Sequence, residues 1–110
     1  MTKEIKIQTL HPETGKQNKL ISLEKYEIIK ATILQILGKG SLTHTELMQA
    51  IYDEIHIGFN GNTHWYGETV KLDLEARNLI KRNNAKPPVY SVIEGGIDSL
   101  LQYKNNQTIL

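Results

Sequence analysis

Polar and β-branched residues alternate at the start of the chain, and this pattern predicts a strand. Between residues 4 and 10, charged or polar side chains alternate with Ile and Thr, a period of two that is typical of a half-buried strand. The run from His11 to Lys16 contains a proline and a glycine, and apolar character resumes at Leu20 and Ile21. We therefore expect an N-terminal β-hairpin with strands near residues 4–10 and 18–22.

Two capped helical patterns follow the hairpin. Ser22 is a suitable N-cap, and apolar residues then repeat at helical spacing until Gly38, where the helix should end. Thr43 and Glu46 have the spacing of a capping box, in which each side chain bonds the backbone N–H of the other residue. The sequence predicts helices near residues 23–37 and 44–56. Ile28 lies off the apolar stripe of the first helix, so we expect another part of the structure to cover it.

A third helix is expected over residues 63–80, with Asn62 or Thr63 as its N-cap. At roughly 100° per residue, its side chains fall into two apolar stripes and one polar arc. The stripes are Trp65, Thr69, Leu72, Ala76 and Leu79, and Tyr66, Val70 and Leu74; the polar arc is Gly67, Glu68, Lys71, Glu75 and Asn78. Asp73 and Arg77 lie between the stripes at i,i+4 spacing, which favours a partly covered ion pair over a catalytic carboxylate.

The segment after Ile80 is cationic and predicts a hairpin. The cations from residue 77 to 86 are Arg77, Lys81, Arg82 and Lys86, with no acid among them. We expect strands near residues 79–83 and 88–92, joined by a loop whose two prolines cannot extend a ladder. In the C-terminal segment, Ile97, Leu100 and Leu101 indicate one or two helical turns.

The composition is that of one globular domain. The chain has 110 residues, 39% hydrophobic and 23% charged, with a formal net charge of +1. It has no cysteine, so disulfides and thiolate sites are excluded. Its apolar runs are too short for a membrane span, and the N-terminus lacks the apolar centre of a signal peptide, so we expect a cytoplasmic protein. The predicted division is a domain at residues 1–93 and a tail at residues 94–110.

The run from Leu72 to Ile80, LDLEARNLI, resembles the end of the recognition helix in winged helix-turn-helix proteins. Asn78 stands where such proteins often have Gly, and Asn also tolerates a left-handed conformation. A fuller set, made of residues 11–16, 65–66 and 70–77, is similar to an uncharacterised family of small bacterial winged-helix proteins, and the resemblance covers roughly residues 5–92. The resemblance implies an α+β, mainly α fold: a three-helix core with a C-terminal wing hairpin, an extra N-terminal β-hairpin and a short C-terminal helix. It implies a role in DNA binding but no known activity or ligand.

The residues that could carry catalysis or bind metal are scattered. Asp53 and His56 share a helix face, but two ligands without a third do not make a metal site. The serines lack the context of an activated nucleophile. We therefore predict a protein that is not an enzyme, with no catalytic residues, metal, cofactor or small-molecule ligand.

The fold and the cations of the hairpin favour a transcriptional regulator that binds DNA. Lys81, Arg82 and Lys86 are expected to meet phosphates, and the start of the third helix is expected to be exposed and to enter the major groove. The helix residues in this prediction are Asn62, Thr63, His64, Gly67 and Lys71. Against it, Lys71 is the only Lys or Arg between residues 46 and 75, whereas six acids lie there. They are Glu46, Asp53, Glu54, Glu68, Asp73 and Glu75. The alternative is a winged-helix protein-interaction module that does not bind DNA.

A homodimer is a further prediction from the sequence. Ile97, Leu100 and Leu101 are too few to form a stable isolated helix, so they must pack against a surface. An exposed apolar spot near Ile28 on a second copy is one such surface, and the chain's own domain is the other.

Overall fold

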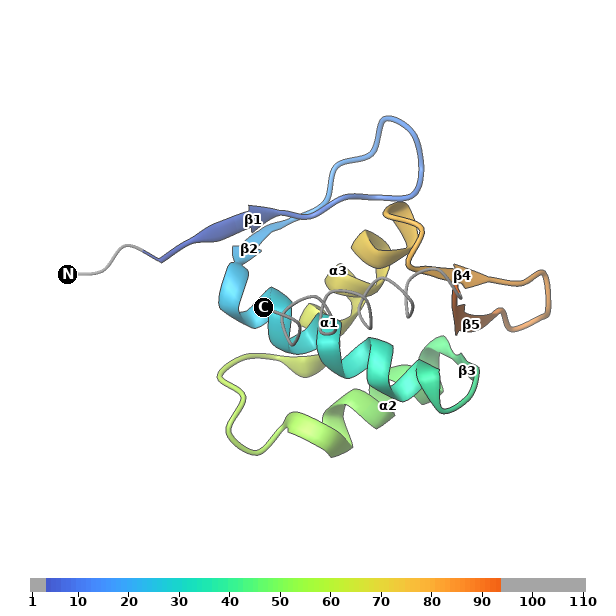
Figure 1. The fold of residues 1–110 in the computed structure, drawn as a ribbon. Helices are drawn as coiled ribbons and strands as arrows, with labels where there is room; N and C mark the ends of the chain where they lie inside the picture. The colour runs from blue at the N-terminus through green and yellow to red at the C-terminus, as the bar shows by residue number, and fades with distance from the viewer. Residues whose placement is uncertain (1–3, 94–110) are drawn as a thin grey trace, which may run out of the picture.

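The structure is a computed structural model that describes residues 4–93. Three helices pack together, and two small antiparallel sheets lie beside them, which makes an α+β fold (Figure 1). The elements in chain order are β1 (Lys6–Gln8), β2 (Leu20–Ser22), α1 (Leu23–Gly38), β3 (Leu42–Thr43), α2 (His44–Ile55), α3 (Thr63–Ala76), β4 (Ile80–Arg82) and β5 (Val89–Val92). This order confirms the predicted strands and helices within residues 4–93. The predicted C-terminal helix and the tail at residues 94–110 lie outside the described residues.

The N-terminal hairpin forms as predicted, and its loop reaches the third helix. β1 and β2 pair antiparallel with Ile7 opposite Ile21, and Ile21 is buried against the core. The Asn18 side chain donates to the backbone oxygen of Thr69 at 3.0 Å, which attaches the loop to α3. Figure 1 shows this loop at the top of the molecule, above the end of α3.

The three helices enclose one apolar core, because each contributes a stripe of branched side chains. Its fully buried members are Ile29, Ile33, Leu47, Ile51, Val70 and Leu74. The predicted caps are present: Ser22 caps α1, Thr43 and Glu46 form the capping box of α2, and Asn62 caps α3. Each cap satisfies a backbone N–H that the first turn of a helix leaves unpaired.

The third helix ends at Ala76, four residues before the predicted end. Asn78 has a φ of 62°, the left-handed conformation expected for it. The N–H of Leu79 then donates to the backbone oxygen of Leu74 at 2.9 Å, which closes the end of the helix. The chain therefore leaves α3 early enough for Ile80 to begin β4 with its side chain in the core.

The hairpin β4–β5 forms as predicted, and a third strand joins it. β3 pairs with β5, so the strand order of this sheet is β3-β5-β4. We did not predict β3, since it has only two residues and one of them, Thr43, is also the N-cap of α2. Through β3, the sheet is connected to the start of α2. Within the described residues, none of the helices is long and apolar enough to span a membrane.

Candidate nucleic-acid interface

The predicted DNA-binding residues of the third helix lie mostly in the interior, so the prediction of an exposed stripe is wrong for three of them. Thr63, Gly67 and Lys71 are buried, whereas Asn62 and His64 are exposed as expected. The reason is that α2 packs on this side of α3. A Cβ atom on Gly67 would lie 2.9 Å from the sulfur of Met48, so the missing side chain is what lets the two helices approach this closely.

Lys71 is held inside the protein by polar partners from two other elements. It is 4% exposed, and its Nζ lies 3.0 Å from Nδ1 of His44 and 3.2 Å from the hydroxyl of Tyr90. Nζ also lies 4.4 Å from the centre of the Tyr90 ring, and a carboxylate oxygen of Glu68 is 3.5 Å away. The Lys71 ammonium group can only donate, so in this contact Nδ1 of His44 is the acceptor. Lys71 therefore connects α3 to α2 and β5, and its charge is not available to phosphates.

The environment of His44 fits this arrangement. Burial, and next the positive charge of Lys71, hold the pKa of His44 below its ordinary value, while Glu68 acts in the opposite direction. The cluster of Lys71, His44, Glu68 and Tyr90 is called the lysine cluster below.

Asp73 forms a second buried cluster on the opposite side of α3. Its carboxylate is fully buried and accepts from the backbone N–H of Leu10 at 2.8 Å, from the Tyr26 hydroxyl, and from Nε of Arg77 at 2.9 Å. Burial and this carboxylate raise the pKa of Tyr26 well above its usual range, and the same carboxylate raises the pKa of Arg77. The predicted Asp73–Arg77 ion pair is confirmed. These four residues, the aspartate cluster, fasten the N-terminal hairpin and α1 to α3.

The face of α3 that remains open is acidic and apolar. Its exposed or half-exposed residues are His64, Trp65, Glu68, Leu72, Glu75 and Ala76. Trp65 is 44% exposed, so its predicted place in a covered apolar stripe is wrong. Within α3, all of which the structure describes, Lys71 is the only Lys or Arg, and it points away from this face. The helix face expected to enter DNA thus presents two carboxylates and no cation.

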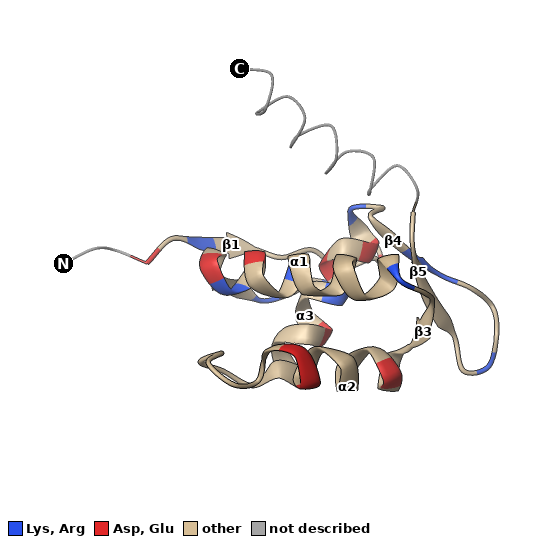
Figure 2. Ribbon diagram, turned by 60° about the horizontal axis from the view of Figure 1, so that its bottom comes forward, with Lys and Arg blue, Asp and Glu red and all other residues tan. Residues whose placement is uncertain are grey.

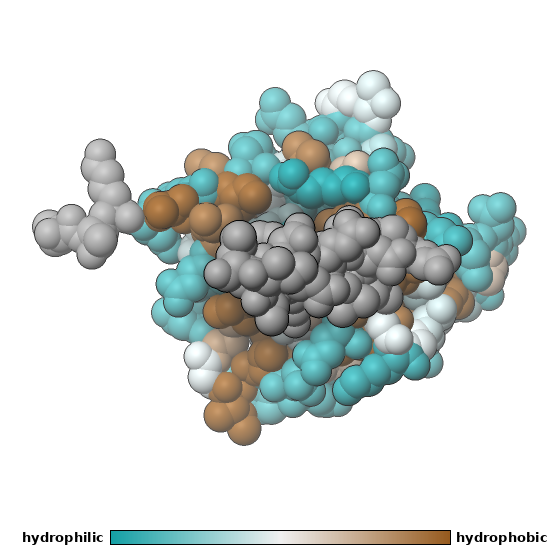
Figure 3. All heavy atoms as spheres, in the orientation of Figure 1, coloured by the Kyte–Doolittle hydropathy of each residue, from teal (hydrophilic) through white to brown (hydrophobic). Residues whose placement is uncertain are grey.

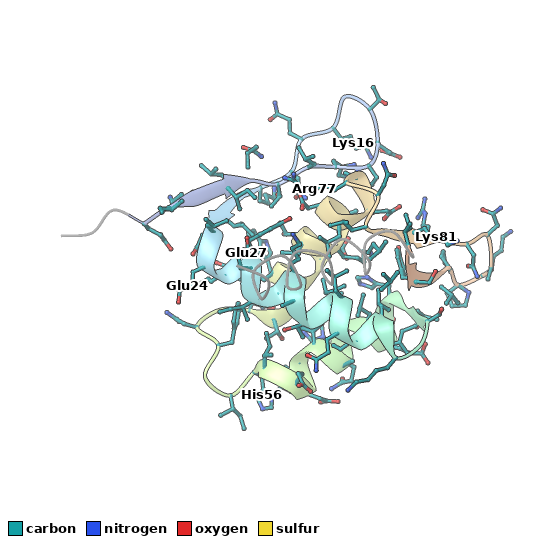
Figure 4. The ribbon with its side chains drawn as sticks, in the orientation of Figure 1. Lys16, Glu24, Glu27, His56, Arg77 and Lys81 are labelled. Atoms are coloured by element: carbon teal, nitrogen blue, oxygen red, sulfur yellow. The ribbon has the colours of Figure 1, made fainter. Side chains whose placement is uncertain are left out.

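The hairpin β4–β5 presents the cations that α3 lacks. Lys81, Arg82 and Lys86 are all exposed, as expected, and Figure 2 shows Lys and Arg positions along this hairpin and its loop. Successive residues of a strand point to opposite faces, so Lys81 and Arg82 lie on different faces of the hairpin. Arg82 is on the α3 side, where its Nε lies 3.7 Å from a carboxylate oxygen of Glu75. Figure 4 shows Lys81 on the right of the molecule, at the far end from Glu24 and Glu27 of α1.

The loop of the hairpin is held by one asparagine. Oδ1 of Asn83 accepts from the backbone N–H of Ala85 at 3.1 Å and from that of Val89 at 2.9 Å, which closes the turn that carries Lys86.

The loop of the N-terminal hairpin lies close enough for the charge of Arg82 to affect Glu13. The main cause that lowers the pKa of Glu13 is its hydrogen bond with Lys16, and Arg82 adds a smaller effect. Figure 4 shows Lys16 at the top of the molecule, with Arg77 below it.

The remaining polar residues do not assemble another chemical site in the part of the chain that the structure describes. Within residues 4–93, no group of three or more His, Asp or Glu could hold a metal ion. His56 stacks on Tyr52 with 4.1 Å between ring centres, and Nδ1 of His11 accepts from the N–H of Glu13. Sequence reasoning did not identify His44 and Tyr90 as partners of Lys71. Gly67 was the only feature of the sequence that could have indicated the burial of this side of the third helix, because a glycine inside a helix often marks a close contact with another element.

The chain matches a protein family over most of its length. The model of a family of unknown function, DUF6958, matches residues 6–90, from β1 into β5. No curated protein matches the chain. The family description states neither a fold nor an activity, so the resemblance to winged-helix proteins stays a prediction.

Proposed function

This chain belongs to DUF6958, a family of unknown function, and we propose that it is a winged-helix domain that binds DNA mainly through its β4–β5 hairpin. The hairpin is called the wing below. Three packed helices, a short strand between the first two, and a hairpin directly after the third support this assignment. So does the left-handed Asn78 at the junction of α3 and β4.

The observation that carries the proposal is the distribution of charge between the wing and α3. The three cations of the wing, Lys81, Arg82 and Lys86, are exposed, whereas the open face of α3 carries Glu68 and Glu75. DNA binding depends on cations that neutralise phosphates. The usual placement of a recognition helix in the major groove would bring both carboxylates close to the DNA backbone. The wing is therefore the better candidate for the main contact.

The placement of cations on both faces of the wing suits insertion into a groove. The major groove is wide enough for a two-stranded β-ribbon, and phosphates line it on both sides. Lys81 on the outer face and Arg82 on the α3 face would then meet opposite walls, with Lys86 at the tip. A wing that lay flat on one DNA strand would leave one of these cations unused.

The test is the salt dependence of binding to a short random-sequence DNA duplex, measured by fluorescence anisotropy on the full chain. Neutralising Lys81, Arg82 and Lys86 to Gln should lower the slope of log affinity against log salt by about three units, by the rule of roughly one counterion per phosphate contact. The matched control replaces Lys6, Lys19 and Lys30 with Gln, which removes the same charge from other parts of the surface. The control should keep most of the slope. Equal losses in both variants would contradict the assignment to the wing.

Glu68 provides a test with the opposite sign. Glu68→Gln removes a negative charge from the open face of α3 and should strengthen binding by a few-fold at low salt. At low salt the charge of Glu68 acts on a duplex held by the wing without any contact between the duplex and α3, so weaker binding by Glu68→Gln would contradict the proposed geometry. Absence of any binding at low salt would contradict DNA binding itself.

The second candidate is a protein-interaction module, and the open face of α3 favours it. Trp65 is 44% exposed and lies on the same face as Leu72 and Ala76, and aromatic residues of this kind are enriched where proteins bind each other. Trp65 is the only tryptophan of the chain, so its fluorescence reports this face alone. If DNA binds through the wing, the emission of Trp65 should change little on saturation with the duplex. A large shift in emission would place the partner on α3.

A further inference from the structure

An apolar groove with an acidic rim lies at the end of the molecule away from the wing. It runs between the start of α1 and the loop that joins α2 to α3, and Figure 1 shows both at the left, opposite the wing. It has a volume of about 500 Å³. Its apolar lining is Ile28, Ile55, Ile57 and Phe59, and its acids are Glu4, Glu24 and Glu54.

The apolar side chains of the groove are unusually accessible. Ile57 is 87% exposed and Ile28 is 40% exposed, while Ile55 and Phe59 are partly buried against the core. Ile57 lies in the turn that ends α2, directly before Gly58, whose φ of 93° directs the chain away from the helix. Figure 3 shows hydrophobic side chains gathered at the lower left, over this loop. The sequence prediction that another part of the structure covers Ile28 is therefore only partly fulfilled by residues 4–93.

The rim of the groove has a negative charge that the described part of the chain does not neutralise. None of Glu4, Glu24 and Glu54 forms a salt bridge with another residue between 4 and 93. The one cation in the lining, Lys25, lies over the ring of Tyr66 at 5.3 Å from its centre. Three acids against one lysine leave a surplus of two negative charges around the apolar lining.

From this combination we infer that the groove binds an amphipathic, cationic segment of a partner protein. A helix with Leu, Ile or Phe on one face and Lys or Arg beside that face would cover Ile57 and Ile28 and pair with the acids of the rim. A second copy of this chain does not fit in the same way. A two-fold symmetric interface places the same patch on both subunits, so six acids and two lysines would come together at one interface. The inference is independent of DNA binding, since the groove and the wing are at opposite ends.

The experiment uses a labelled amphipathic peptide of Leu and Lys, about 15 residues long so that it can form a helix, and the full chain. Binding is measured by fluorescence anisotropy at several salt concentrations, with a Leu and Glu peptide of the same pattern as the probe of opposite charge. The Leu and Lys peptide should bind, and more weakly as salt increases. The Leu and Glu peptide should bind at least about tenfold more weakly, because the rim repels it.

Two pairs of variants separate the apolar lining from the rim. Ile28→Ser with Ile57→Ser should weaken binding of the Leu and Lys peptide at least about tenfold, since each side chain is exposed in the free protein and covered in the complex. Glu24→Gln with Glu54→Gln should weaken it by a few-fold at low salt and little at high salt. The matched controls are Leu20→Ser, an exposed apolar residue outside the groove, and Asp53→Asn, an acid next to Glu54 outside the lining. Both controls should bind like the unchanged chain.

Three outcomes would overturn the inference. Equal binding of the two peptides would remove the role of charge. Equal weakening in the controls and in the groove variants would show binding elsewhere on the surface. A chain that sediments as a dimer, becomes monomeric with Ile28→Ser and Ile57→Ser, and does not bind the peptide would assign the groove to a second copy.

Discussion

Lys71 and Asp73 lie two positions apart on α3 and are both buried, yet they are stabilised in different ways. Asp73 is fully buried, and its partners are Arg77 on the same helix, Tyr26 on α1 and a backbone N–H in the N-terminal hairpin loop. Lys71 is 4% exposed, and its partners His44 and Glu68 remain half-exposed to water. The carboxylate of Asp73 is fully enclosed, whereas the lysine cluster opens to solvent through His44 and Glu68.

Of the two clusters, only the Asp73–Arg77 pair could be predicted from the sequence. Asp73 and Arg77 are four residues apart, a spacing that brings side chains together on any helix. The partners of Lys71 in the other elements are 27 and 19 residues away, and their proximity depends on how α2 and β5 pack. A lysine among polar residues at helical spacing is usually exposed. The burial of Lys71 changes the functional interpretation, because it leaves the open face of α3 without a cation.

Removal of the Asp73 side chain should have the largest effect on stability. Asp73→Ala leaves the N–H of Leu10, the hydroxyl of Tyr26 and the guanidinium of Arg77 without their common acceptor. Breaking a buried pair in this way typically costs about 3–5 kcal/mol, and the partial exposure of Arg77 puts the expected loss at the lower end of that range. Urea unfolding followed by circular dichroism measures it, with the exposed Asp53→Asn as the control. A loss below about 1 kcal/mol would contradict the account of a fully enclosed carboxylate.

Removal of the Tyr26 hydroxyl tests one bond of the same cluster. Tyr26→Phe keeps the ring in the core and deletes only the donor to Asp73, and a hydrogen bond to a charged group contributes about 1.5–3 kcal/mol. We expect a loss within that range in the same unfolding experiment. In the double variant with Asp73→Ala, the Tyr26→Phe change should cost much less, because the acceptor is already absent. Additive losses would show that the two groups do not depend on each other.

Replacement of Lys71 should affect stability less than the changes in the aspartate cluster. Lys71→Met keeps a long, unbranched side chain in the interior, and water can solvate the half-exposed His44 and Glu68 that remain. We expect a change in the free energy of unfolding within about 1 kcal/mol in either direction. DNA binding should also be unchanged, since Lys71 does not face solvent. A loss equal to that of Asp73→Ala would remove the distinction between the clusters, and a loss of DNA affinity would return Lys71 to the interface.

The smallest expected effect is a pH dependence of stability that comes from His44. Its pKa in the folded protein is below the ordinary value of 6.5, first because of burial and then because of Lys71. As pH falls below 6.5, the unfolded chain takes up a proton that folded His44 resists, so stability decreases until the folded pKa is reached. His44→Gln should remove this part of the decrease, and Lys71→Met should reduce it. The measurement is the urea midpoint of each variant between about pH 7.5 and pH 5, and an identical pH profile for His44→Gln and the unchanged chain would contradict it.

Local patterns predicted most of the fold, and long-range packing decided the rest. Alternation predicted the first strand, the loop with two prolines after Ile80 predicted the second hairpin, and the caps at Ser22, Thr43 and Asn62 placed the helix starts within a residue. The end of α3 was placed four residues too late, because the apolar periodicity continues through Leu79 and Ile80 after the backbone has left the helix at Asn78. The exposure of Trp65 depends on which side of α3 the other elements cover, and no local pattern shows it.

The candidate interface likewise contains residues whose exposure follows from local sequence and residues whose burial follows from long-range packing. Lys81, Arg82 and Lys86 lie in a hairpin that projects from the domain, so their exposure follows from the local sequence alone. Thr63, Gly67 and Lys71 lie on a helix packed on two sides, and their burial follows from the position of α2. The wing is thus the part of the predicted interface that depends least on tertiary packing.

The measurement that tests the central claim most directly is the change in backbone amide NMR signals when a short DNA duplex is added to the full chain. If the wing makes the main contact, the largest shifts should fall on residues 80–92, and residues 64–75 of α3 should shift little. Shifts centred on the open face of α3, around Trp65 and Leu72, or no shifts in either segment at low salt, would contradict it.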